Sequence, residues 1–203
     1  MKSCSFLLLG LKNTCIFNLT IVAIYNELLS SSQEIINIQI VIDTDAITTG
    51  YPNPSKDPTN PTGLPHNYMY MVATRSDVIT GSGTANLSIK ANVGDIIRWH
   101  AVSENSNFDS AVVIYNLSQF GGTTVFNNLT FSVYTRQGIL PIDRATLPVD
   151  FSTQSFWFNQ ANVINTGTEY YTVQFALYVR QGDLADPVLF GYYYWNPTVT
   201  VQQ

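Results

Sequence analysis

Residues 169–201 of the chain read EYYTVQFALYVRQGDLADPVLFGYYYWNPTVTV, and this stretch decides the class of fold. Apolar residues occupy every second position from Tyr171 to Val179, a pattern typical of a half-buried β-strand. Gly, Asp and Pro in residues 181–187 then indicate a turn. The aromatic run 189–195 is apolar on both faces, so we expect a second strand that other segments cover. Because an isolated hairpin is unstable in water, the rest of the chain must supply further strands.

Alternating apolar residues and turn signals recur along most of the chain. Residues 85–102 predict a second hairpin with its turn at Gly94 and Asp95. Further strands are expected at residues 36–42, 68–72, 111–117, 125–135 and 156–163. No stretch has a convincing helical period. The sequence therefore predicts an all-β fold, a single antiparallel β-sandwich of jelly-roll or immunoglobulin-like type, with little helix apart from an N-terminal extension.

The predicted strands also define the side chains that should fill the core. These are the residues on the apolar side of each alternation, namely Ile38, Ile40, Leu87, Ile89, Ile97, Trp99, Val173, Phe175 and Leu177. The length of 203 residues suits one domain with a core of its own. The apolar patches of Met1–Ser32 are interrupted by polar residues and match no strand. We therefore expect residues 1–35 to be an extension outside the fold and residues 36–203 to form the β-sandwich domain.

The amino-acid composition argues against some classes of binding partner. The chain has 9 Lys and Arg against 14 Asp and Glu, a net charge of -5, and no basic cluster that could bind nucleic acid or an anionic membrane surface. Charged residues are only 11% of the total, so repulsion between copies is weak and self-association is favoured. Both cysteines, Cys4 and Cys15, precede the first predicted strand. The body therefore has no thiol for a zinc site, a disulfide or a nucleophile.

One long segment has no regular pattern of apolar residues, and its length suggests a function. Residues 48–68 carry five of the nine prolines, and loops of this length in compact domains are usually either functional or disordered. Because the prolines fix φ, we expect this loop to be ordered and to lie over one end of the sandwich. The most suggestive polar residues at its root and within it are Asp43, Asp45, Tyr51, Asn53 and Asp57. Strand alternation would place the carboxylates of Asp43 and Asp45 on one face, where they can bind calcium or cap turns.

The sequence gives less support for a transition-metal site or for catalysis. The body has two histidines, His66 and His100, too few for a transition-metal site without many carboxylates. No catalytic residue is predicted, and a hydrolase with paired carboxylates ranks lowest among the alternatives. A set of tyrosines is expected at the surface, where it can stack on sugar rings or form a subunit interface: Tyr51, Tyr68, Tyr70, Tyr192 and Tyr194.

Several unusual strings occur in a fixed order along the body. They are INIQIVIDTDAI at 36–47, YPNPSKDPTNPTG at 51–63, VGDIIRW at 93–99, FWF at 156–158 and GYYYWNP at 191–197. Together they resemble the bacterial inclusion-body protein family called PixA or AidA, over residues 36–201. The resemblance implies a cytoplasmic protein that accumulates to high levels, in some relatives as crystalline inclusions, with production tied to cell density or to life with a host. It implies no catalytic residues and no cofactor.

Two functions of different classes follow from these observations. The first is a non-enzymatic inclusion-body-type protein that forms homo-oligomers or larger assemblies, favoured by the low charge, the surface tyrosines and the resemblance. The second is a carbohydrate-binding module that uses the tyrosines and Asp43 and Asp45, with or without calcium. A glycan array would distinguish them.

Overall fold

The computed structural model describes residues 33–141, 147–182 and 186–203. The chain divides after Glu34 into two units, and the fold below is that of the second unit, Ile35–Gln203. The predictions for residues 1–32 lie outside the described residues, and the assignment of residues 1–35 to an extension stays a prediction.

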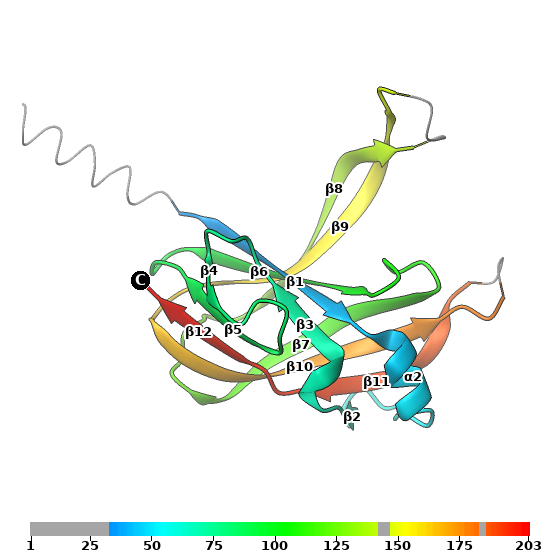
Figure 1. Cartoon of the computed structure of the whole chain (residues 1–203), viewed down its shortest axis with the longest axis horizontal. Coiled ribbons are helices and arrows are strands. Elements are labelled where there is room, and N and C mark those ends of the chain that lie inside the picture. The colour runs from blue at the N-terminus through cyan, green and yellow to red at the C-terminus, as the bar shows by residue number, and fades with distance from the viewer. Residues whose placement is uncertain (1–32, 142–146, 183–185) are drawn as a thin grey trace, which may run out of the picture. The chain divides into compact units, whose positions relative to one another are not determined.

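The described residues of this unit form two β-sheets with short helical segments between strands (Figure 1). One sheet has five strands in the order β3-β1-β6-β9-β8. The other has seven strands. Six follow the order β2-β11-β10-β12-β5-β4, and the seventh, β7, pairs with β10 outside this order. The elements are β1 (Ile35–Ile42), α2 (Thr44–Gly50), β2 (Thr62–Gly63), the 3-10 helix η1 (His66–Tyr68), β3 (Met69–Val72), β4 (Val78–Thr80), β5 (Asn86–Lys90), β6 (Ile96–Ser103), β7 (Ser110–Gly122), β8 (Thr130–Leu140), β9 (Asp150–Asn162), β10 (Gly167–Val179), β11 (Val188–Trp195) and β12 (Thr198–Gln202).

The predicted all-β class is confirmed, whereas purely antiparallel pairing is wrong. Strand β1 runs parallel to β6, β12 runs parallel to β5, and the short β2 runs parallel to β11. Each parallel pair joins strands that are far apart in sequence. Alternation of apolar residues is the same in parallel and antiparallel strands, so the sequence pattern could not reveal these pairings.

The hairpin that residues 169–201 predicted is present, but the one predicted at residues 85–102 is not. Strands β10 and β11 pair antiparallel from Val173 opposite Trp195 to Val179 opposite Val188. In contrast, β5 lies in the seven-stranded sheet and β6 in the five-stranded sheet. The turn at Gly94, where φ is +103°, therefore crosses from one sheet to the other. Both strands face the same core, so their alternation imitates that of a hairpin.

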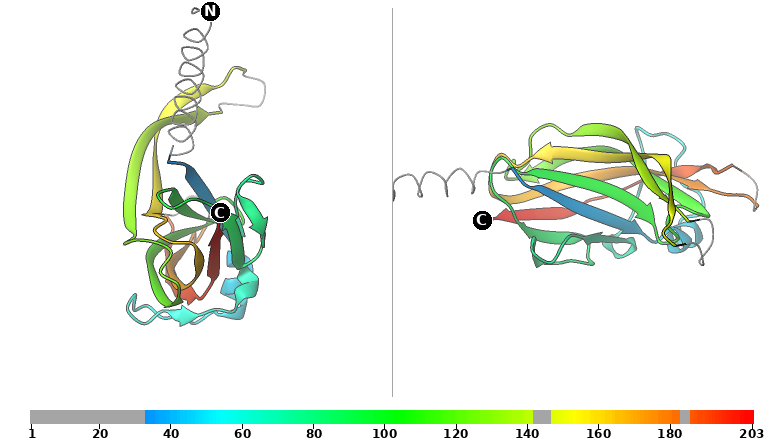
Figure 2. Two further views of the ribbon diagram at one scale, coloured as in Figure 1. Left: turned by 90° about the vertical axis from the view of Figure 1, so that its left-hand side faces the viewer. Right: turned by 90° about the horizontal axis from the view of Figure 1, so that it is seen from above.

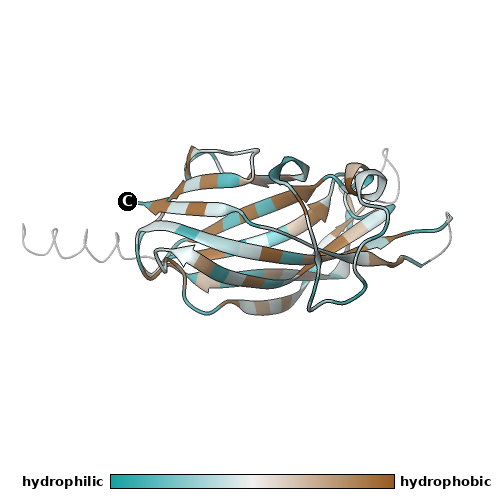
Figure 3. Cartoon of the chain, turned by 90° about the horizontal axis from the view of Figure 1, so that it is seen from below, coloured by the Kyte–Doolittle hydropathy of each residue, from teal (hydrophilic) through white to brown (hydrophobic). Residues whose placement is uncertain are grey.

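All nine predicted core side chains are buried. Figure 3 shows the alternation along the strands, with hydrophobic and hydrophilic residues in turn. The buried residues of both sheets belong to one cluster. Trp99 of β6 meets Tyr171 of β10 at 6.4 Å between ring centroids, and Phe175 packs on Tyr193 and Trp195. The core therefore lies between the two sheets, as in a sandwich.

The segment after β1 is helical, although the sequence predicted no helix at this position. Strand β1 ends at Ile42, and α2 begins at Thr44 with Asp43 as its N-cap. Thr44 is fully buried, and both its backbone N–H and its hydroxyl donate to the Glu104 carboxylate. Ile47, also fully buried, joins the core. A helix of seven residues is too short to show a clear period in sequence, which is why the pattern missed it.

Candidate functional site

The five residues predicted from the Pro-rich segment fall into two groups. Asp43 and Asp45 do not share a strand face, because the strand has ended before them. The Asp43 side chain accepts from the backbone N–H of Ala46 at 3.0 Å, and Asp45 lies in the first turn of α2. Tyr51 caps the other end of α2 and packs against the ring of Tyr68 at 6.0 Å. These three residues therefore lie at the two ends of one short helix.

Asn53 and Asp57 lie farther along, where the segment runs beside β11. Ser55 bridges to Tyr192, and Pro54 packs on Gly191, where an added Cβ would approach the proline ring to 2.3 Å. The Asp57 carboxylate accepts from the backbone N–H and the hydroxyl of Thr59, and these bonds lower the pKa of Asp57. The segment is thus held along an edge of the seven-stranded sheet. A ligand site at the five residues stays a prediction.

The predicted calcium site can be compared with the arrangement of acidic side chains in the described residues. Within residues 33–141, 147–182 and 186–203 no three His, Cys, Asp or Glu side chains are grouped so that they could hold a metal ion. A calcium site in this segment would therefore need backbone and amide oxygens around single carboxylates. Calcium binding stays a prediction.

The predicted tyrosine platform is distributed over separate contacts. Tyr51 and Tyr68 pack against the core cluster, Tyr192 meets the ring of Tyr115 at 5.6 Å, and Tyr194 lies over Gly63. Of the five tyrosines, only Tyr70 is more than a third exposed. The tyrosines thus serve mainly to hold the Pro-rich segment and its neighbours on the sheets.

A different feature stands out in the structure: the two-stranded ribbon of β8 and β9. The strands pair from Thr130 opposite Gln160 to Leu140 opposite Asp150, while β6 pairs only with the end of β9, from Asn159 to Asn162. The rest of the ribbon bends away from the two sheets (Figure 2). The sequence predicted shorter strands here, ending at 135 and beginning at 156. The alternation of apolar residues thus predicted the root of the ribbon but not its projecting part.

The root of the ribbon is anchored in the core. Phe126, just before β8, packs edge-on against Trp99 with ring centroids 5.0 Å apart. The buried carboxylate of Glu169 accepts from the backbone N–H groups of Val125 and Phe126 at 2.7 and 3.1 Å. Burial raises the pKa of Glu169, although these two hydrogen bonds oppose the rise. A fixed root gives the projecting strands a defined direction.

One face of the ribbon continues the core-facing side of the five-stranded sheet, and we call it the inner face. Register places Phe131 of β8 opposite Asn159 of β9, which is itself opposite the buried Trp99. The large apolar side chains of this face are exposed because no strand covers them: Phe131 by 54%, Val133 by 61%, Ile139 by 64% and Phe151 by 65%. Between Val133 and Ile139 the same face carries two polar pairs, Thr135 opposite Ser155 and Gln137 opposite Thr153. The face therefore presents two exposed apolar groups, Phe131 with Val133 and Ile139 with Phe151, separated by a polar middle.

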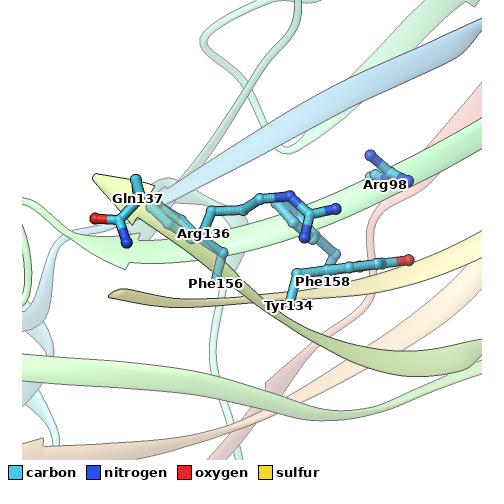
Figure 4. A pocket seen from close by; sticks show the side chains of 6 residues that line it. All are labelled: Arg98, Tyr134, Arg136, Gln137, Phe156 and Phe158. Atoms are coloured by element: carbon cyan, nitrogen blue, oxygen red, sulfur yellow. The ribbon is translucent and has the colours of Figure 1, made fainter. Parts of the chain in front are cut away.

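The opposite face of the ribbon, which we call the outer face, carries a pocket. It has a volume of about 310 Å³ and is lined by Arg98, Tyr134, Arg136, Phe156 and Phe158 of this face, together with Gln137, which the register assigns to the other face (Figure 4). Arg98 comes from β6 and the other five come from the ribbon. The two guanidinium carbons each lie 5.7 Å from the centroid of the Tyr134 ring, and that of Arg98 lies 5.4 Å from Phe158. These are cation–π contacts.

Sequence reasoning missed this pocket although it singled out one of its strings. The motif FWF at 156–158 contributes to the family resemblance, but its pattern alone does not indicate a pocket. Arg98 lies within residues 85–102, where the sequence predicted a hairpin that the structure does not form. The signal that could have found the pocket is an arginine within an aromatic-rich strand, at Arg136 beside Tyr134. Pairing of β8 with β9 and of β9 with β6 brings these residues together.

Comparisons with known proteins bear on the whole body of the chain. A family model described as PixA, inclusion body protein, matches residues 34–201. The crystal structure of the inclusion body protein PixA from Burkholderia cenocepacia J2315 is similar, with a TM-score of 0.74 and 30% sequence identity. The match covers 86% of this chain and 99% of that one. A search of curated proteins found no match. Among the described residues, no helix is long and apolar enough to cross a membrane.

Proposed function

Because the chain belongs to the PixA inclusion body protein family, we propose that it is a non-enzymatic protein that self-associates and is stored in cytoplasmic inclusions of a bacterial cell. Production linked to cell density or to life with a host is part of the same proposal and rests on family resemblance alone. The inner face of the β8–β9 ribbon is the single observation that carries self-association.

The occupant of the inner face that we propose is the same face of a second copy. Exposed apolar groups such as the two on this face mark interaction sites, and a two-fold axis would bring the face against itself. Neither strand contains Lys, and the charged residues of the ribbon are Arg136 and Asp150, so association brings few like charges together. The low charge of the whole chain, 11%, supports the same conclusion.

The free edge of β8 adds a second contact of the same kind. Strand β8 is the last strand of its sheet, eleven residues long and without Pro or Lys. Natural edge strands are usually protected by Pro or charged residues, of which β8 has only Arg136, and a weakly protected edge pairs readily with another chain. Assembly that uses both the face and the edge can grow beyond a dimer, as storage in an inclusion requires.

Sedimentation velocity of the full chain over a wide concentration range tests this proposal. We expect the sedimentation coefficient to rise with concentration. Val133→Asp should shift the protein toward monomer, because a carboxylate on the inner face would be desolvated in the assembly. Val93→Asp is the matched control, since Val93 is 56% exposed and lies in the turn before β6. A monomer at every concentration, or equal effects of the two variants, would refute the proposal.

Carbohydrate binding is the second candidate, and one pocket favours it. A polar depression of about 360 Å³ lies between β7 and the ribbon and is lined by Tyr115, Asn116, Leu117, Asn128, Leu129, Phe131 and Asn159. Amide groups beside aromatic rings suit sugar hydroxyls and ring faces. A glycan array read with calcium and with a chelator tests it. Because Phe131 belongs to both surfaces, a glycan that binds here should also weaken assembly.

A further inference from the structure

We infer that the pocket on the outer face of the ribbon binds a planar organic anion, a flat apolar ring system that carries a carboxylate. The inference is independent of self-association, since it uses the opposite face of β8 and β9. Figure 4 shows the Arg136 side chain extending along the Tyr134 ring toward Arg98. The pocket thus combines two cationic groups with three aromatic rings in about 310 Å³.

Within the part of the chain that the structure describes, no carboxylate balances the charge of the two arginines. Among the described residues, neither guanidinium makes a salt bridge to a carboxylate. Arg98 donates from Nε to the amide oxygen of Gln160 at 3.1 Å, and Arg136 donates to the carbonyl of Thr135 at 3.0 Å. The chain has more acidic than basic residues, 14 against 9. Two like charges that flank one ring in such a chain leave a local positive potential that an anion would neutralise.

The geometry of the arginines favours a carboxylate in particular. A guanidinium carries five N–H donors in its plane, and contact with an aromatic ring uses its face. Among the described residues, Arg98 and Arg136 each make one hydrogen bond, which leaves further N–H groups of each guanidinium to donate to a ligand. A carboxylate accepts two such bonds side by side, and this charge-assisted pairing is stronger than a neutral hydrogen bond.

The apolar part of the ligand follows from the rest of the lining. Phe156 is partly exposed, and Tyr134 and Phe158 meet at 6.2 Å between centroids. Aromatic rings in offset or edge contact with a second ring gain free energy beyond area burial. A pocket of this volume lies at the small end of ligand sites, so it suits a ligand of one or two fused rings.

Isothermal titration calorimetry of the full chain with 1-naphthoate provides the test. We expect 1-naphthoate to bind and the neutral 1-naphthylmethanol, with the same rings, to bind much more weakly. Arg136→Gln should weaken the binding of 1-naphthoate by about tenfold or more, as loss of a charge-assisted contact implies. Arg136 is exposed on β8, so the substitution should leave the melting temperature unchanged. Arg75→Gln, at an exposed arginine outside the ribbon, is the matched control for net charge.

Three results would overturn the inference. Absence of binding by 1-naphthoate would show that the pocket is not a ligand site. Equal affinity for the acid and the alcohol would show apolar adsorption without recognition of the anion, a result that needs no variant. Equal weakening by Arg136→Gln and Arg75→Gln would show an effect of overall charge alone. Concentration-dependent sedimentation is measured separately, so failure here leaves the self-association proposal standing.

Discussion

Removing the ring of Phe175 should destabilise the fold strongly. Phe175 is fully buried in β10, where its ring stacks on Tyr193 at 5.7 Å and meets Trp195 edge-on at 5.9 Å. Truncation of such a phenylalanine to alanine costs about 3–5 kcal/mol through lost transfer free energy and the cavity that remains. Each aromatic contact adds about 0.5–1.5 kcal/mol, which places Phe175→Ala toward the upper end of that range.

Phe131→Ala is the matched control, because it deletes the same atoms at a site that the fold does not cover. Phe131 is more than half exposed on the ribbon, so its truncation should change the stability of the monomer by no more than about 0.5 kcal/mol. Urea denaturation of both variants at low protein concentration measures the two free energies. A loss below about 1 kcal/mol for Phe175→Ala, or similar losses for both variants, would contradict the core and the ribbon described above.

Three further predictions concern Glu169, Lys56 and the first 32 residues. Burial raises the pKa of Glu169 above its usual 4.5, so the folded state binds this proton more tightly than the unfolded state does. The free energy of unfolding should therefore fall as the pH rises from 4.5 through the raised pKa. Glu169→Gln should flatten that decline in urea midpoints, and equal pH slopes for the variant and the original chain would argue against it. Lys56 donates to the carbonyls of Leu189 and Phe190, so limited trypsin digestion should cleave the native chain slowly after Lys56, and rapid cleavage would show that the segment is not held. A chain that starts at Gln33 should keep a cooperative thermal melt; its loss would show that the fold needs residues 1–32.

The sequence predicted the core better than the pairing, and the reason is physical. Ile38, Trp99 and Phe175 could be assigned to the interior because strand alternation directly reports which side chains avoid water. Alternation carries no information on the partner strand or its direction, so the parallel pairing of β1 with β6 was missed. The same limit produced the false hairpin around Gly94, whose two strands lie in different sheets.

The site was harder to predict than the fold. Asp43 looked like half of a carboxylate pair, but a short helix begins after it and takes its side chain as a cap. Nothing local to Phe131 or Val133 indicates that the second layer is missing over the ribbon, because exposure depends on where the seven-stranded sheet ends. The pocket of Arg98 and Arg136 requires two strand pairings across the chain, and these are not visible in a single sequence.

Self-association through the inner face is tested most directly by photo-crosslinking in solution. A benzoyl-phenylalanine in place of Phe131 should form adducts between two copies, with mass spectrometry locating the attachment on β8 or β9 of the second chain. The same group in place of Phe108, which is exposed in the turn before β7, should form few. Adducts from position 131 that fall within a single chain, or equal yields between copies from both positions, would contradict the account.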